Sequence, residues 1–143
     1  MTKDEIVRKY LGVPFVHKGR DLKGIDCYGL LCLVYRDLGY ILPDYTDYGI
    51  EDYKREWYEE GKDYYLQLYH TLWEKVEKPE PWDGLLFRHS RHTNTINHVG
   101  IYLGDEQFLH CYEGSEVGVA RLDRPYWSRR LYGSFRFKGK NER

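Results

Sequence analysis

One cysteine in this sequence stands where helix geometry would make its thiol reactive. Asp26 is a preferred N-cap residue, and an apolar helix is predicted to follow it from Cys27 onward. The first backbone N–H groups of a helix are unpaired and the helix dipole is positive there, so both favour a thiolate at Cys27. Cys32, in an apolar stretch of the same helix, is predicted to be an inert core residue. Position alone leaves a purely structural role for Cys27 equally open.

Two histidines could supply the base that a cysteine nucleophile needs. His98 opens an alternating strand, and His110 lies in the next one, after the hairpin signal Gly104-Asp105. A three-residue loop centred on Gly104 would place the two histidines directly opposite each other on one face, with Cβ atoms about 5 Å apart. Either imidazole could then hydrogen-bond the other. The same pattern also fits two unrelated histidines on a half-exposed sheet.

Other candidate groups do not complete a second site. His89 and His92 are spaced like metal ligands, but their segment reads as a solvated loop, and no carboxylate or cysteine cluster completes a four-ligand set. The sequence has no glycine-rich phosphate loop, no dinucleotide fingerprint and no serine nucleophile motif. We therefore expect neither a metal nor a cofactor.

The elements that would position these residues form a single α+β domain over residues 1–143. Thr2 and Glu5 have the spacing of a capping box for a first helix, and Gly39 ends the second helix, which begins at Asp26. Alternating apolar runs predict an antiparallel sheet of about five strands. These strands lie at residues 85–87, 98–103, 107–112, 117–122 and 131–137.

The segment 44–81 differs from the rest of the chain. It is rich in Tyr, Glu and Lys, and part of it, residues 51–76, could be helical. Two roles fit this composition: a solvated cover over the core, or a wall on the substrate or partner side.

Composition excludes several classes of function. Lys and Arg number 22 against 23 Asp and Glu, a net charge of −1, so the basic excess of a nucleic-acid-binding protein is missing. No apolar run approaches the roughly 20 residues that span a bilayer, and the charged first ten residues lack the apolar core of a signal peptide. Three cysteines are too few for a disulfide scaffold. The sequence thus predicts no nucleic-acid partner, no membrane partner and no signal peptide.

Four segments of the chain have the order, spacing and context of a known family: Tyr-Leu-Gly-Val-Pro-Phe at 10–15, Gly-Ile-Asp-Cys-Tyr-Gly-Leu at 24–30, His-Val-Gly-Ile-Tyr-Leu-Gly at 98–104 and Phe-Leu-His at 108–110. Through these segments the chain resembles the NlpC/p60 family of papain-like cysteine peptidases. The resemblance implies a papain-like fold in which Cys27 is the nucleophile, His98 the base and His110 the orienting third residue. It also implies hydrolysis of peptidoglycan stem peptides, typically at the γ-D-glutamyl bond to a diamino acid.

Within this family the sequence is most similar to the phage-tail branch. Tyr28, where many members have serine, and the Pro-Tyr-Trp-Ser segment at 125–128 carry this resemblance. It implies a phage or prophage context, with phage-tail proteins as possible partners. The protein would then be associated with the virion or tail, or be cytoplasmic until assembly or release.

One position departs from the family pattern. The tyrosine that usually lies twelve residues before the nucleophile, and whose hydroxyl is thought to help bind the oxyanion, is replaced by Phe15. The oxyanion would then depend on the backbone N–H of Cys27 and on another tyrosine such as Tyr28; losing one donor costs on the order of 100-fold in rate. The residues predicted on the substrate side are Phe15, Arg20, Lys23, Asp26 and Tyr28.

Two other functions remain open from the sequence. A structural tail component with a vestigial site is favoured by Phe15 and opposed by the intact cysteine and histidine set. A thiol amidase or acyltransferase on the same scaffold would share the nucleophile but act on a lipid or protein substrate.

Overall fold

The computed structural model describes residues 1–43, 72–88 and 96–139 of the chain. The predicted helical part of 44–71 and the histidine loop at 89–95 lie outside the described residues. The elements in chain order are α1 (Lys3–Tyr10), β1 (Arg20–Asp21), β2 (Gly24–Ile25), α2 (Cys27–Asp37), β3 (Trp73–Val76), β4 (Gly84–Arg88), β5 (Ile96–Gly104), β6 (Gln107–Cys111), β7 (Val117–Arg121), α5 (Pro125–Ser128) and β8 (Leu131–Phe137).

Both predicted helices begin where their capping residues stand. The Thr2 hydroxyl accepts a hydrogen bond from the Glu5 backbone N–H at 3.2 Å, and the Glu5 carboxylate accepts one from the Thr2 N–H at 3.3 Å, which completes the capping box of α1. Asp26 has extended backbone angles and caps α2. Gly39, in the left-handed region at φ 98°, follows the last turn of α2 and ends it.

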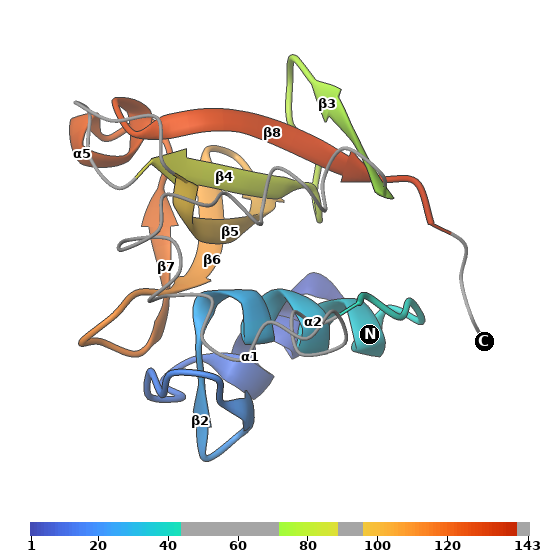
Figure 1. The fold of residues 1–143 in the computed structure, drawn as a ribbon, viewed down its shortest axis with the longest axis vertical. Coiled ribbons are helices and arrows are strands. Elements are labelled where there is room, and N and C mark those ends of the chain that lie inside the picture. Colours follow the sequence, from blue (N-terminus) through green and yellow to red (C-terminus); the bar gives the residue numbers. More distant parts are fainter. Residues whose placement is uncertain (44–71, 89–95, 140–143) are drawn as a thin grey trace.

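The described strands β3 to β8 build one antiparallel sheet in the order β3-β8-β4-β5-β6-β7, and β1 pairs with β2 as a small separate hairpin. Figure 1 shows the sheet lying over the two N-terminal helices, with α5 at one end of β8 and the hairpin of β1 and β2 below α2. This arrangement confirms the predicted α+β class. The sheet has six strands rather than about five, because Trp73–Val76, predicted as part of a helix, pairs with β8 as β3.

The two faces of the sheet pack into different clusters. The face toward α2 presents Leu86, Val99 and Ile101 to a large core that also holds Ile6 and Leu30. Cys27 belongs to this core. The other face presents a smaller cluster, whose members are Leu85, Phe87, Tyr102, Phe108 and Leu122, with Ala120, Trp127 and Leu131 packed against them. Period-two alternation along each strand therefore separates the residues that hold α2 from those that surround the histidines.

Candidate active site

Cys27 is the first residue of α2, and a network of buried polar contacts fixes its position. The Asp26 carboxylate accepts hydrogen bonds from the Gly29 N–H at 2.7 Å and from the Lys18 N–H at 2.9 Å. Asp26 is only 2% exposed, and burial raises the pKa of its carboxyl group, whereas the Arg20 guanidinium and the two N–H donors act in the opposite direction. These bonds tie the first turn of α2 to the preceding loop, so the Cys27 thiol, which is also buried, has a defined place at the helix N-terminus.

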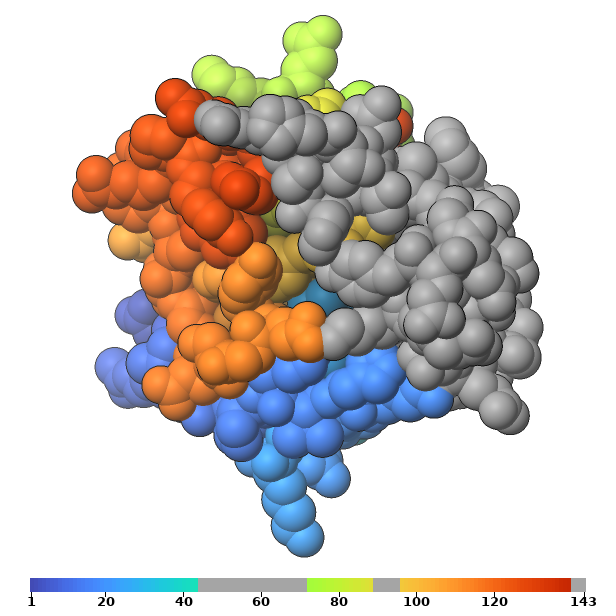
Figure 2. All heavy atoms as spheres, turned by 60° about the vertical axis from the view of Figure 1, so that its left-hand side comes forward, coloured from blue at the N-terminus to red at the C-terminus, as the bar shows by residue number. Residues whose placement is uncertain are grey.

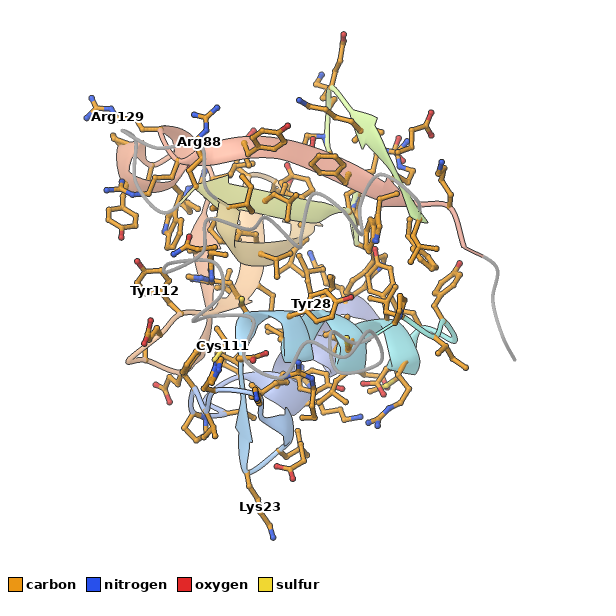
Figure 3. All side chains as sticks on the ribbon, in the orientation of Figure 1. Lys23, Tyr28, Arg88, Cys111, Tyr112 and Arg129 are labelled. Carbon is orange, nitrogen blue, oxygen red and sulfur yellow. The ribbon has the colours of Figure 1, made fainter. Side chains whose placement is uncertain are left out.

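Arg20 and Lys23, both predicted on the substrate side, have different positions. Arg20 Nη1 lies 2.8 Å from Asp26 Oδ1 and also donates to the Gly19 carbonyl. A Cβ atom at Gly29 would lie 2.7 Å from that nitrogen, so only glycine lets the arginine reach this side of the helix. Figure 3 shows Lys23 at the tip of the β1–β2 hairpin, directed away from the body of the protein. The structure thus brings Arg20 to the N-cap carboxylate and does not bring Lys23 to the site.

Phe15 and Tyr28 both lie close to Cys27. Phe15 is half-buried, forms an isolated bridge with Ile25, and packs against the core that contains Cys27. The Tyr28 hydroxyl donates its proton to the Pro43 carbonyl at 2.5 Å. A hydroxyl has one proton to donate, so Tyr28 cannot act as the oxyanion donor suggested by the sequence while this bond is made.

His98 and His110 form a hydrogen-bonded pair across β5 and β6. His98 Nε2 lies 2.9 Å from His110 Nδ1, which confirms that the two imidazoles share a face and a hydrogen bond. The predicted direct opposition is wrong: Ile101 pairs with Leu109 and Tyr102 with Phe108, and this register places His110 across from Gly100. The two histidines are therefore diagonal neighbours, a separation that rings can span.

The different register comes from the turn. Asp105 and Glu106 both have positive φ, 52° and 63°, and Gly104 pairs with Gln107, so the connection is a tight two-residue turn of the type I′ kind. The prediction assumed a three-residue loop centred on Gly104. The turn alone would displace the register by three residues, but an irregularity between Tyr102 and Gly104 reduces the displacement along the strands to two, which leaves every side chain on its predicted face.

Burial keeps both imidazoles of the pair neutral at physiological pH. His98 is 4% exposed; burial, and next the neighbouring His110, hold its pKa well below the ordinary value. Burial lowers the pKa of His110 to about 4. A neutral imidazole has one N–H and one lone pair, so one ring donates and the other accepts in the bond between them. The pair can therefore accept one further proton, and it carries no positive charge at pH 7.

Three aromatic residues, Tyr112, Tyr126 and Trp127, surround the pair and form what we call the aromatic rim. The Trp127 ring stacks on His98 at 5.5 Å between centroids and meets His110 edge-on at 4.9 Å. It also contacts Tyr112 and Tyr126, whose hydroxyl oxygens lie 3.0 Å apart. Sequence reasoning assigned the 125–128 segment no role at the site, and its proline, at the start of the short helix α5, was the one local signal of this element.

The start of α2 and the histidine pair lie at the same end of the sheet. Cys111, the residue after His110, points to the opposite face and donates its thiol to the Ile25 carbonyl at 3.3 Å, two residues before Cys27. Burial, and next the nearby Cys27, raise the pKa of Cys111 to about 12. Figure 3 shows Cys111 beside the first turn of α2, with Tyr112 next to it on the outside. Figure 2 shows a hollow on this face, in which part of α2 is visible between β5 and the segment that follows β6.

Such a site has the groups needed for nucleophilic chemistry. A thiol at a helix N-terminus and a neutral, buried imidazole with a second imidazole behind it are the parts of a cysteine nucleophile and its oriented base. Among the residues that the structure describes, no three His, Cys, Asp or Glu side chains gather as a metal site would require. Within the same ranges, no helix is both long enough and apolar enough to cross a membrane.

Comparison with known proteins places the chain in a family. A model of the NlpC/P60 family matches residues 12–136. The Murein DD-endopeptidase MepS/Murein LD-carboxypeptidase of Escherichia coli (strain K12) is 32% identical over 133 residues, which are 90% of this chain and 60% of that protein. The probable peptidoglycan endopeptidase LytE of Bacillus subtilis (strain 168) is 25% identical over 128 residues, 89% of this chain and 31% of that protein. The chain spans no more than 60% of either relative.

Solved structures agree with the sequence match. A Staphylococcus aureus protein described as similar to lipoprotein, NLP/P60 family, superposes with a TM-score of 0.67 at 25% identity, covering 96% of this chain and 40% of that one. The NlpC/p60 domain of the peptidoglycan hydrolase SagA gives a TM-score of 0.52 at 25% identity, covering 83% of this chain and 86% of that domain. The family match spans nearly all of the sequence and includes the cysteine and both histidines. This chain belongs to the NlpC/P60 family.

Proposed function

We propose that this protein is a cysteine peptidase that hydrolyses an amide bond in the peptide part of peptidoglycan, with Cys27 as nucleophile. The observation that carries the proposal is the half-buried His98–His110 hydrogen bond at the end of the sheet where α2 begins with Cys27. The names of the two bacterial relatives, a murein endopeptidase and a probable peptidoglycan endopeptidase, support the substrate class.

The hydrogen bond between the two imidazoles leaves one nitrogen of His98 to act as the base. His98 Nε2 is engaged with His110, so Nδ1 is the nitrogen left to accept the thiol proton of Cys27. If Nε2 carries the hydrogen of the shared bond, proton uptake at Nδ1 makes that bond charge-assisted and therefore stronger. His110 would thus orient the base and stabilise its imidazolium form.

Covalent catalysis would follow the ordinary order of steps. The Cys27 sulfur attacks the carbonyl carbon, the oxyanion forms and collapses, and His98 passes its proton to the leaving amine. Water then attacks the acyl-enzyme, with His98 as the base, and releases the carboxylic acid. The backbone N–H of Cys27, at the N-terminus of α2, is one donor placed to meet the oxyanion.

The choice of bond and the biological setting stay predictions. The sequence points to the γ-D-glutamyl bond to a diamino acid, whereas the Escherichia coli relative is named for DD-endopeptidase and LD-carboxypeptidase activities. The predicted phage-tail or prophage association is not supported by the relatives described above, which are named for murein or peptidoglycan hydrolysis. Defined substrates can separate the bonds.

The test uses purified protein with isolated peptidoglycan and with soluble stem peptides that contain one candidate bond each. We expect new amine termini whose masses identify the bond, and we expect Cys27→Ala and His98→Ala to release none. Cys32→Ala is the matched control, because it removes a second thiol from the same helix. Release by Cys27→Ala, or none by the unaltered protein on any of these substrates, would contradict the proposal and favour a structural role or another thiol reaction.

Thiol labelling tests the nucleophile without assuming a substrate. Limited iodoacetamide treatment near pH 7, followed by mass mapping, should modify Cys27 well before Cys111, because Cys111 is fully buried and burial raises its pKa to about 12. Cys32 should also react slowly. Equal modification of all three thiols in the folded protein would argue against Cys27 as the nucleophile.

A further inference from the structure

Four arginines gather around α5, next to the aromatic rim, and we call them the arginine corner: Arg88, Arg124, Arg129 and Arg130. The Arg88 N–H donates to the Arg130 carbonyl at 2.7 Å, which joins the end of β4 to the residues after α5. Figure 3 shows the Arg88 and Arg129 side chains at this corner, both directed away from the sheet. Arg124 and Arg129 flank α5 as its N-cap and C-cap residues, and both are exposed.

The corner keeps an excess of positive charge within the described part of the chain, where Asp123 acts on Arg124 but is itself bonded to Arg121. Elsewhere the fold pairs its cations: Arg20 with Asp26, Arg121 with Asp123, Arg136 with Asp83, and Lys9 with Asp37. Within residues 1–43, 72–88 and 96–139, none of the four corner arginines forms an ion pair. Since the whole chain has a net charge of −1, the corner is a local excess of positive charge and does not reflect overall composition.

One arginine of the corner is held rigidly against the aromatic rim. The Arg130 guanidinium lies 3.8 Å from the centroid of the Tyr126 ring, and its Nη1 donates to the Tyr126 carbonyl at 2.8 Å. Tyr126 contacts Trp127, and Trp127 stacks on His98. A continuous set of ring contacts therefore connects the positive charge to the proposed base, which places the corner beside the site.

We propose that the arginine corner binds carboxylates of the peptide substrate that flank the bond to be cut. This inference rests on the proposed function and names the charge that the site recognises. A guanidinium presents paired N–H donors that match the two oxygens of a carboxylate. The corner takes the role predicted for Arg20 and Lys23, since Arg20 is committed to Asp26 and Lys23 points away from the site.

The experiment measures binding in the Cys27→Ala protein, so that hydrolysis does not interfere. The probes are a fluorescent stem peptide with free carboxylates and the same peptide with those carboxylates amidated. The double variant Arg124→Gln/Arg129→Gln removes two exposed charges whose side chains have no described bonds. The matched control is Lys3→Gln/Arg8→Gln, which removes two exposed charges from α1.

We expect the corner variant to raise Kd for the free-carboxylate peptide about tenfold, as two exposed charge pairs allow, and to leave Kd for the amidated peptide unchanged. The control should leave both constants unchanged, and thermal midpoints should match throughout. Equal losses for both peptides, equal losses in both variants, or no preference of the Cys27→Ala protein for the free carboxylates would overturn the inference. Charge-selective binding without any hydrolysis by the unaltered protein would instead refute the proposed function and leave the corner as an anion-binding surface.

Discussion

His110 should make the stability of this protein depend on pH in a way that a single substitution can reveal. Burial lowers its pKa from 6.5 to about 4. In the unfolded chain the imidazole binds a proton near pH 6.5, but in the native protein it does so only near pH 4. Between these values the unfolded state holds more protons, so the free energy of unfolding must fall as pH falls.

The size of the effect follows from the shift. Each unit of pKa corresponds to about 1.4 kcal/mol, so the contribution of His110 should fall by about 3 kcal/mol between pH 7 and pH 4. For a chain of this length that loss corresponds to a decrease of about 10 °C in Tm. The contribution is fully present above pH 6.5 and is lost progressively below it.

The assay compares the unaltered protein with His110→Gln by urea unfolding at several pH values from 7.5 to 4. Glutamine keeps a hydrogen-bonding side chain but does not titrate, and carboxylates elsewhere affect both proteins equally. The stability difference between the two proteins should therefore change by about 3 kcal/mol over this range, in the direction that disfavours the unaltered protein in acid. A constant difference would refute the reasoning, because it would mean that the imidazole of His110 takes up protons as readily in the native protein as in the unfolded chain.

Three further predictions concern the supports of the site. Trp127→Leu should lower kcat at least tenfold and change KM little, because Trp127 positions both imidazoles by ring contact and His98 would lose its stacking partner; an unchanged kcat would show that the rim serves only stability. Asp26→Ala should lower the free energy of unfolding by about 2 kcal/mol and slow the alkylation of Cys27, because it removes the N-cap of α2, and chemical unfolding with thiol labelling would measure both. Phe15→Tyr should raise kcat about tenfold if the new hydroxyl meets the oxyanion, and a fall in kcat together with a lower Tm would show that the position serves packing.

Much of the fold could be predicted because local signals and packing agree. Thr2 and Asp26 cap the helices that they were expected to cap, and the alternating runs from His98 and from Gln107 form neighbouring strands. In each case the side-chain pattern that buries an apolar face also satisfies the backbone hydrogen bonds. The sequence could also predict that His98 and His110 lie on one face of the sheet. Side chains alternate between the two faces along a strand, so a register error of two residues leaves the face unchanged.

The register depended on the geometry of one turn and the extra strand on a distant partner, and the alternation of apolar residues reports neither. Two consecutive residues with positive φ, Asp105 and Glu106, make the turn tighter than a loop centred on Gly104, yet neither is a glycine. Trp73–Val76 was predicted as the end of a helical segment, but its structure is decided by pairing with β8, more than 50 residues later in the chain. The intrinsic propensity of these four residues gives no information about their partner strand.

For the candidate residues near the site, position was easier to predict from the sequence than role. Arg20 and Tyr28 were both predicted close to Cys27, but each has its polar group committed, to Asp26 and to the Pro43 carbonyl. A sequence shows that a donor is present and does not show which acceptor it already serves. Trp127 was missed as a site residue because its contacts with both histidines form only when β8 returns beside β4.

The fold separates Arg20, which is paired with Asp26, from the arginine corner, and this separation suits the proposed chemistry. At the start of α2 the charge of the Arg20 guanidinium is balanced by the Asp26 carboxylate. The electric field at the Cys27 sulfur therefore comes chiefly from the helix N-terminus, which stabilises a thiolate without a mobile cation beside it. An unpaired arginine at that point would also attract the carboxylates of the substrate into the position that the scissile carbonyl must occupy. The arginine corner lies beyond Tyr126 and Trp127 instead, where it can hold anionic groups away from the reacting atoms. We therefore expect charge reversal at the corner to act on KM and disruption of the Asp26–Arg20 contact to act on kcat, a division that steady-state kinetics on one carboxylate-bearing peptide can measure.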